Sequence, residues 1–538
     1  MLAGFYPDPS ICRVGEDFYL VNSTFAWFPG IPVFHSRDLV NWNLLGHVMD
    51  RPEQLNTNGM GVSRGLFAPA ISHHEGLFYL TCTLVDGGGN FVVTAENPAG
   101  PWSDPHWLPE VNGIDPSLFF DENGQAYIVY NSDAPDNKPL YPGHRSVRMF
   151  EFDYRNLRVV GEEKLLVNGG VDITQNPVWI EGPHLYRIND FYYLMAAEGG
   201  TAEDHREVIF RSKSVAGPYL PWAGNPILTQ RHLPPQRPHA ITSTGHADLV
   251  QTPNGDWWAV FLGIRPYPPE EQHRYNTGRE TFLAPVRWTG DGWPVINPDF
   301  EEVQYRYPMP VMPADPPGPI PYSGNFTYRD EFEGAELGPN WQFLRTPLQK
   351  WYALEAGVLR ISLRPESCAG SGNPALVARR QQHLVGAVST SMQFQPAADN
   401  EKAGLLAFQN EGRYYVFCRG LQEGKPVVQL LRSVDSPDSR KSEEVLASQV
   451  LPPDWQGEAL LLKIEFKNAH YRFSYGMEGQ DWQILADSVD AAYIRGNIPR
   501  DFTGVMLGMY ATSSGKPSQN AARFSWFEYR GNDEVYQP

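Results

Sequence analysis

The sequence predicts an all-β protein with two domains, a five-bladed β-propeller followed by a β-sandwich of the jelly-roll, concanavalin-like type. Three observations support this prediction. The chain has 538 residues, more than one hydrophobic core usually serves. Its 13% aromatic content, 49 glycines and 48 prolines suit many short strands joined by turns. A hairpin pattern also occurs five times in the first half, and few segments have helical periodicity.

Each repeat consists of an apolar strand, a polar turn and a second strand rich in aromatic residues, which is the composition of a β-hairpin. The five repeats start at Asp8, Phe67, Asp115, Glu181 and His246. A spacing of roughly 50 to 65 residues is typical of four-stranded propeller blades with loop insertions. The repeat therefore predicts five blades within residues 1–307.

Three segments at 33–42, 92–102 and 209–219 resemble one another and follow the hairpins. Each is interpreted as a third strand, a turn and an outer strand entered through an aromatic residue. A β-sandwich built from the same hairpins is the alternative, and composition alone does not exclude it. The regular restart of one pattern at a long interval favours the propeller.

A proline-rich segment ends the repeats and predicts a linker over residues 308–325. Beyond it, segments at 357–363, 414–418, 460–466 and 471–475 alternate apolar with polar residues, as half-buried antiparallel strands do. These strands predict the sandwich over residues 326–538.

Charge and composition limit the partners. The net charge of −19 disfavours binding to nucleic acid, whereas a neutral polar substrate is compatible with it. No segment has the apolar length of a membrane span, and the N-terminus lacks the pattern of a signal peptide, which together predict a cytoplasmic protein. The four cysteines are far apart, which favours buried thiols over a zinc site or disulfides. An oligomer is compatible with the sequence, which does not determine the oligomeric state.

The first strands of propeller blades surround one axis, so their starting residues should meet at one mouth of the channel. Asp8, Asp115 and Glu181 would then converge with His246. When the five strands are aligned on their apolar residues, Glu181 lies one position earlier than the others. Converging carboxylates differ in protonation, as cleavage of a glycosidic bond requires. The alternative is that each Asp merely caps a turn. Three acids at matching places in a repeat favour the catalytic interpretation.

Three motifs resemble those of glycoside hydrolase family 43, in particular its β-xylosidase and α-L-arabinofuranosidase members with a C-terminal β-sandwich. The motifs are Phe5-Tyr6-Pro7-Asp8-Pro9-Ser10-Ile11, Gly113-Ile114-Asp115-Pro116-Ser117-Leu118-Phe119 and Glu181-Gly182-Pro183-His184-Leu185-Tyr186. The resemblance covers nearly the whole chain. It implies an inverting hydrolase with Asp8 as general base, Glu181 as general acid and Asp115 as the residue that positions Glu181 and raises its pKa.

The same resemblance implies four substrate-binding residues. Phe25 would form an aromatic wall of the sugar pocket, and Arg279 would hydrogen-bond sugar hydroxyls through its fork of donors. Phe67 stands where relatives often have Trp, so the shape of the pocket on the leaving-group side stays open. Phe502 resembles a loop aromatic that enters the active site from the second domain. Ordinary packing within the fold is the alternative for Phe25 and Phe67.

His246 resembles the histidine with which similar enzymes hold a calcium ion beneath the pocket. Because calcium prefers oxygen ligands, one imidazole and waters would form a weak, exchangeable site. The alternative is a histidine that only hydrogen-bonds a neighbouring carboxylate.

The predicted activity is exo-acting hydrolysis of pentose oligosaccharides, with release of terminal xylose, arabinose or both. An endo-arabinanase is an alternative that would need an open cleft. A non-catalytic carbohydrate-binding protein is a second alternative, which the presence of all three acids disfavours.

Overall fold

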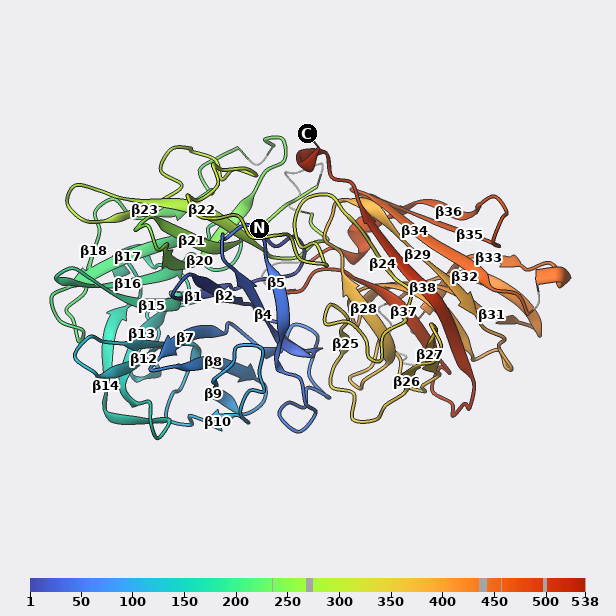
Figure 1. The fold of residues 1–538 in the computed structure, drawn as a ribbon, viewed down its shortest axis with the longest axis horizontal. Coiled ribbons are helices and arrows are strands. Elements are labelled where there is room, and N and C mark those ends of the chain that lie inside the picture. The colour runs from blue at the N-terminus through green and yellow to red at the C-terminus, as the bar shows by residue number, and fades with distance from the viewer. Residues whose placement is uncertain (235, 268–273, 435–442, 456, 497–500, 538) are drawn as a thin grey trace.

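The computed structural model describes residues 1–234, 236–267, 274–434, 443–455, 457–496 and 501–537, and it confirms the all-β prediction (Figure 1). The described helices are short 3-10 turns: Pro135–Asn137, Ile173–Gln175, Pro453–Trp455, Ala491–Ile494 and Glu534–Tyr536. In the described parts of the chain, no helix is long and apolar enough to cross a membrane. Cys82, Cys368 and Cys418 are buried free thiols, and Cys12 is half-buried.

The first part of the chain forms five antiparallel sheets. The first contains β1 (Ser10–Val14), β2 (Asp17–Val21), β4 (Gly30–Ser36) and β5 (Asn43–Met49). The second contains β6 (Gly65–Leu66), β7 (Ala70–His74), β8 (Leu77–Val85), β9 (Gly89–Ala95) and β10 (His106–Trp107). The third contains β11 (Ile114–Phe120), β12 (Ala126–Asp133), β13 (Arg145–Asp153) and β14 (Arg158–Asn168).

The fourth sheet contains β15 (Glu181–Ile188), β16 (Phe191–Glu198), β17 (Arg206–Ser212), β18 (Leu220–Pro221) and β19 (Leu228–Thr229). The fifth contains β20 (Thr242–Gln251), β21 (Trp257–Ile264), β22 (Glu280–Trp288) and β23 (Pro294–Ile296). The five predicted hairpins are confirmed, because β1–β2, β7–β8, β11–β12, β15–β16 and β20–β21 pair antiparallel.

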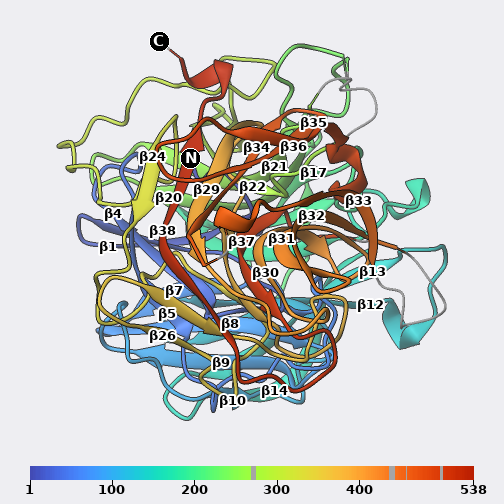
Figure 2. The same ribbon diagram turned by 90° about the vertical axis from the view of Figure 1, so that its right-hand side faces the viewer.

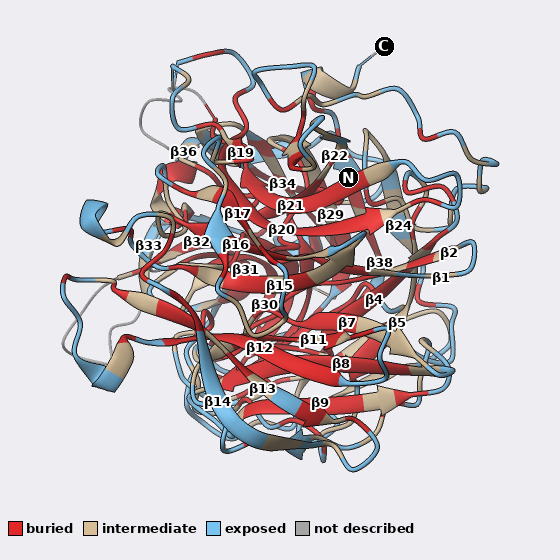
Figure 3. Ribbon diagram, turned by 90° about the vertical axis from the view of Figure 1, so that its left-hand side faces the viewer, coloured by how far each residue is buried: buried red, intermediate tan, exposed pale blue. Residues whose placement is uncertain are grey.

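The hairpins' first strands lie next to one another in order. β1 contacts β7, β7 contacts β11, β11 contacts β15, β15 contacts β20, and β20 contacts β1. Side chains also join these strands: Ser10 Oγ donates to Asp248 Oδ2 at 2.8 Å, and Ser117 Oγ donates to the Pro183 carbonyl at 2.6 Å. The first strands are also more buried than the outer ones. The first strand β20 is almost wholly buried, whereas the outer strand β14 is largely exposed (Figure 3).

Four residues at the starts of these strands have left-handed backbones, namely Asp8, Asp115, Gly182 and His246, with φ between 51° and 57°. The pairing register shifts at the last three of these positions, as expected for β-bulges. A bulge re-aims the side chains around it, and left-handed non-glycine residues cluster at functional sites. The sheets therefore present these residues in one local geometry.

The second part of the chain forms two sheets, which confirms the predicted sandwich (Figure 2). One contains β24 (Thr327–Asp330), β26 (Tyr352–Leu354), β27 (Leu359–Ser362), β29 (Val385–Gln393), β34 (Leu460–Lys467), β35 (His470–Gly476), β36 (Gln483–Asp490) and β38 (Ala521–Gly531). The other contains β28 (Ala375–Arg380), β30 (Lys402–Asn410), β31 (Arg413–Gln422), β32 (Lys425–Ser433), β33 (Glu443–Val450) and β37 (Met506–Thr512). Their apolar faces share one core, which includes Val388, Leu405, Phe417 and Phe527.

The two parts are joined by backbone pairing. β3 (Trp27–Phe28) of the first part pairs with β25 (Phe343–Leu344) of the second. The Phe502 N–H also donates to Ser63 Oγ at 3.0 Å. The loops that carry Phe25 and Phe502 are thus fixed by contacts between the two parts.

A buried ion-pair network also crosses this boundary. Arg265, which is 1% exposed, donates to Glu280 at 2.8 and 2.9 Å and to Asp533 at 2.7 Å. Arg265 and Glu280 belong to the first part and Asp533 lies close to the C-terminus. Removing one member of such a network would leave a buried charge without its partner.

Candidate active site

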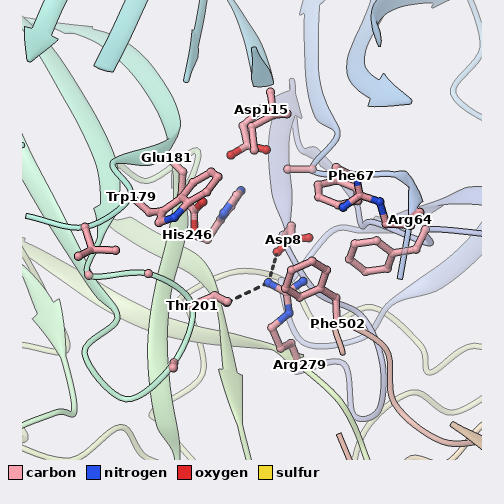
Figure 4. A pocket seen from close by; sticks show the side chains of 17 residues that line it. Asp8, Arg64, Phe67, Asp115, Trp179, Glu181, Thr201, His246, Arg279 and Phe502 are labelled. Atoms are coloured by element: carbon pink, nitrogen blue, oxygen red, sulfur yellow. Dashed lines mark hydrogen bonds and ion pairs between the residues drawn. The ribbon is translucent and has the colours of Figure 1, made fainter. Parts of the chain in front are cut away.

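A cavity of about 510 Å³ lies at the starts of the innermost strands, and all eight predicted site residues line it (Figure 4). They are Asp8, Phe25, Phe67, Asp115, Glu181, His246, Arg279 and Phe502. The carboxylates come from β11, β15 and the segment before β1, so residues more than 170 positions apart share one cavity. The predicted convergence is therefore present in the structure.

Asp8 is buried and held from two sides. Ser23 Oγ donates to Asp8 Oδ2 at 2.6 Å, and Arg279 Nη1 lies 3.1 Å from Asp8 Oδ1. Arg279 Nη1 also donates to Thr201 Oγ1 at 3.1 Å, and dashed lines mark both contacts of this nitrogen in Figure 4. These contacts fix a carboxylate that can accept a proton from a water molecule in the cavity.

Glu181 is half-buried beside the other two acids. Burial and the negative charges of Asp115 and Asp8 raise the pKa of Glu181 to about 8, against the lowering effects of Arg279 and Arg145. Glu181 therefore keeps its proton at neutral pH. Burial raises the pKa of Asp115 as well, while the interaction with His246 and the N–H of Gly182, which donates to Asp115 Oδ2 at 3.1 Å, lower it.

The backbone of Gly182 explains why Glu181 precedes the other acids by one position. Gly182 takes the left-handed position that Asp115 and His246 occupy in their own strands, and it carries no side chain there. A Cβ on Gly182 would lie 2.9 Å from His246 Cε1 and Nε2. Since the His246 ring fills this space, the carboxylate of the fourth sheet comes from the preceding residue.

The predicted aromatic residues form one cluster. The ring of Phe25 stacks on Phe502 at a centroid distance of 5.7 Å and on Phe5 at 5.9 Å, and Phe67 meets Phe25 edge-on at 5.2 Å. Phe25 is only 1% exposed, so it mainly supports the cluster. Phe502 is less buried and lies 4.8 Å from the Arg279 guanidinium. The second part of the chain therefore contributes an aromatic wall to the cavity.

Several lining residues were not predicted from the sequence, among them Arg64, Trp179 and Thr201. Trp179 lies two residues before Glu181, so its position near the acid offered a signal. Thr201 follows the Gly199-Gly200 pair after β16, which marks a loop at the end of a strand. The sequence around Arg64 gives no comparable signal. Arg64 pairs with Asp86 at 2.6 Å, and it lines the cavity because of the conformation of its loop.

His246 is the candidate metal ligand. Within the described ranges, no group of three or more His, Cys, Asp and Glu side chains is arranged to hold a metal. Near His246, the buried Glu207 accepts the Ala247 N–H at 3.0 Å, and its Oε1 has no hydrogen-bond partner in the structure. One imidazole and a single unpaired carboxylate oxygen fit a calcium ion whose other ligands are mostly water.

A cavity that combines a carboxyl of raised pKa, a second fixed carboxylate, aromatic walls and an arginine fork is the site expected of a hydrolase of glycosidic bonds. The chain belongs to glycosyl hydrolases family 43, whose family model matches residues 1–294. A second model, the beta xylosidase C-terminal concanavalin A-like domain, matches residues 329–530. The family assignment and the concanavalin-like sandwich predicted from the sequence are thus confirmed.

Relatives of similar length agree with this assignment. The chain is 37% identical to a non-reducing end alpha-L-arabinofuranosidase of Bacteroides ovatus, over 98% of this chain and 94% of the relative. It is 36% identical to a xylosidase/arabinosidase of Butyrivibrio fibrisolvens, over 98% of each. The crystal structure of a xylan beta-1,4-xylosidase from Bacillus halodurans C-125 has a TM-score of 0.87 and 31% identity, covering 98% of this chain and 99% of that one.

Proposed function

We propose that this protein is an exo-acting, inverting glycosidase that releases terminal xylose or arabinose from pentose oligosaccharides. The observation that carries the proposal is the convergence of three acids in one aromatic cavity, where burial and the neighbouring carboxylates raise the pKa of Glu181 to about 8. The names of the relatives, which include both xylosidases and arabinofuranosidases, support a pentose.

In the proposed mechanism, Glu181 donates its proton to the departing glycosidic oxygen. Asp8, held by Ser23 and Arg279, removes a proton from the water that attacks the anomeric carbon from the opposite face. Asp115 raises the pKa of Glu181 through its negative charge and positions the strand start through the Gly182 N–H. Arg279 and Thr201 present donors and acceptors to the sugar hydroxyls.

Exo action follows from the shape of the site. Phe502, which comes from the sandwich, covers one side of the cavity, and its ring packs on Phe25 and Phe67. A cavity closed in this way admits the end of a chain more readily than its middle. The endo-arabinanase alternative would need an open cleft, and a purely carbohydrate-binding role would not need an acid with a raised pKa.

We also propose that the first five sheets are the blades of a β-propeller. The cyclic order of contacts among β1, β7, β11, β15 and β20 supports five blades around one axis. The division into residues 1–307, 308–325 and 326–538 agrees with the absence of strands between Ile296 and Thr327, a span that the structure describes throughout.

His246 is proposed to hold a calcium ion beneath the pocket. Such an ion would supply a fixed positive charge close to the acids. His246 also has two effects that do not depend on the ion. Its ring fills the space beside Gly182, and its interaction with Asp115 lowers the pKa of that carboxyl.

Hydrolysis of nitrophenyl β-xyloside and nitrophenyl α-L-arabinofuranoside tests the proposed activity, and proton NMR of the first sugar formed tests inversion. Glu181→Gln should lower kcat for xylobiose by about 10²- to 10⁴-fold and leave sugar binding measurable. Nitrophenol leaves without needing a proton, so the loss should be smaller on nitrophenyl substrates. Retention of the anomeric configuration, or an equal loss on both substrates, would contradict the mechanism.

A further inference from the structure

Trp179 presents a large aromatic surface to the active-site cavity, and the proposed catalytic roles do not use it. The residue is 38% exposed, and the neighbouring Val178 is 40% exposed. Both line the cavity, and Trp179 lies on the same side as Glu181, across from Phe67 and Arg64 (Figure 4). An aromatic ring that only completed a core would be buried.

The backbone holds Trp179 in place at a cost. Its φ of 49° is in the left-handed region, which is unfavourable for a residue with a side chain. The Trp179 N–H donates to the Gly143 carbonyl at 2.8 Å, and the Gly199 N–H donates to the Val178 carbonyl at 2.7 Å. A Cβ on Gly143 would lie 2.8 Å from Val178 Cγ1, so this close approach requires glycine. Strain of this kind is typical of functional sites.

The indole ring is also fixed by an arginine. Arg145 Cζ lies 4.8 Å from the centroid of the Trp179 ring, within the range of a cation–π contact. Arg145 Nε in turn donates to Asn131 Oδ1 at 2.7 Å, and Arg145 pairs with Asp133. The ring is therefore held rigidly while part of its surface stays open to the cavity, which lowers the entropy that a ligand loses on binding it.

We infer that Trp179 is the binding platform for the sugar on the leaving-group side of the scissile bond, and that it favours a pyranose ring there. The inference rests on the proposed function, in which Glu181 protonates the glycosidic oxygen. The sugar beyond that oxygen must lie on the side of Glu181, where Trp179 lies. A pyranose chair offers a flat C–H face to an aromatic ring, whereas a puckered furanose or a small alkyl group covers less of it.

This position assigns the leaving group a chemical class. The enzyme would cleave a terminal pentose from a xylopyranosyl unit, the unit of a xylan backbone, in preference to a furanosyl unit. Phe502 and Arg279 surround the sugar that is released, while Trp179 recognises what remains.

Steady-state kinetics on paired substrates tests the inference. Xylobiose carries a pyranose leaving group, and methyl β-xyloside carries the same released sugar without one. Trp179→Ala should lower kcat/KM for xylobiose about five- to twentyfold more than for methyl β-xyloside, and Trp179→Phe should recover most of the difference. The inhibition constant for free xylose reports binding of the released sugar and should change much less.

Trp482 provides a matched control. It is also 38% exposed and has Lys463 Nζ 4.6 Å from its ring, but it belongs to the sandwich and does not line the cavity. Trp482→Ala should leave the ratio of the two substrates unchanged. Equal losses on both substrates in Trp179→Ala, or no loss on either, would overturn the inference. Failure of the proposed function itself would differ, because the wild-type protein would then hydrolyse no pentoside.

Discussion

Arg279 and Asp8 form an ion pair at 3.1 Å inside the active-site cavity, and Thr201 accepts a hydrogen bond from the same arginine nitrogen. One guanidinium thus connects the proposed base, the sugar pocket and the loop after β16. Lysine could keep the charge but could not keep this planar arrangement of donors.

Arg279→Lys should therefore lower kcat/KM on nitrophenyl pentosides by about 10²-fold, because the proposed base and the sugar both lose their orientation. Arg287→Lys is the control, since Arg287 lies on β22, the strand that Arg279 immediately precedes, but pairs with Asp299 on the exposed surface. A loss of the same size in both variants would show that the strand, and not the pair, is responsible.

The activity should fall as the pH rises through about 8. Burial and then the charge of Asp115 raise the pKa of Glu181, and the proposed acid works only while it holds its proton. Asp115→Asn removes that charge, so the alkaline limb of kcat/KM should move to lower pH. The pH profiles of the two proteins on xylobiose provide the measurement, and coincident alkaline limbs would contradict the role of Asp115.

The same shift predicts how stability depends on pH. The pKa of Glu181 is about 8 in the folded protein and 4.5 for an ordinary glutamate, so the folded state binds this proton more tightly. The free energy of unfolding that the folded protein gains from this tighter proton binding is fully present below about pH 4.5 and is lost as the pH rises through 8. Glu181→Gln cannot ionise, and its Tm relative to wild type should rise between pH 5 and 8. A difference that does not vary with pH would contradict the prediction.

Much of the site could be predicted because the repeat places equivalent residues at equivalent strand starts. Asp8, Asp115 and His246 follow this rule directly. Glu181 could be found but its offset could not be explained, because the reason is the space that the His246 ring occupies beside Gly182. Trp179 and Arg64 were missed since their positions depend on loop paths and on contacts with Arg145 and Asp86, which no periodic pattern records.

Calcium removal should lower the activity reversibly. If His246 holds the ion mainly with waters, the site is weak and the ion exchanges. Exhaustive chelation should then lower the rate, and added Ca²⁺ should restore it. The control is His246→Ala, which should no longer respond to the ion. Equal rates before and after thorough chelation of the wild type would contradict the proposal, and calorimetric titration with Ca²⁺ measures binding separately from activity.

Arg265→Met should destabilise the protein by about 3–5 kcal/mol, because Glu280 and Asp533 would stay buried without their cation. Arg523→Met is a suitable comparison, since Arg523 pairs with Glu355 on the exposed surface and such pairs contribute about 0–1 kcal/mol. Urea unfolding of the three proteins measures the difference. Similar values for both variants would show that the network contributes little.

The pairing of β3 with β25 also limits how this enzyme can be engineered. The strand β3, which follows Phe25, has its backbone partner β25 in the sandwich. Exchanging that sandwich for a foreign module would therefore leave the backbone of β3 unpaired next to the catalytic pocket. Chimaeras should therefore keep both halves from one parent, or transplant β3 and β25 together.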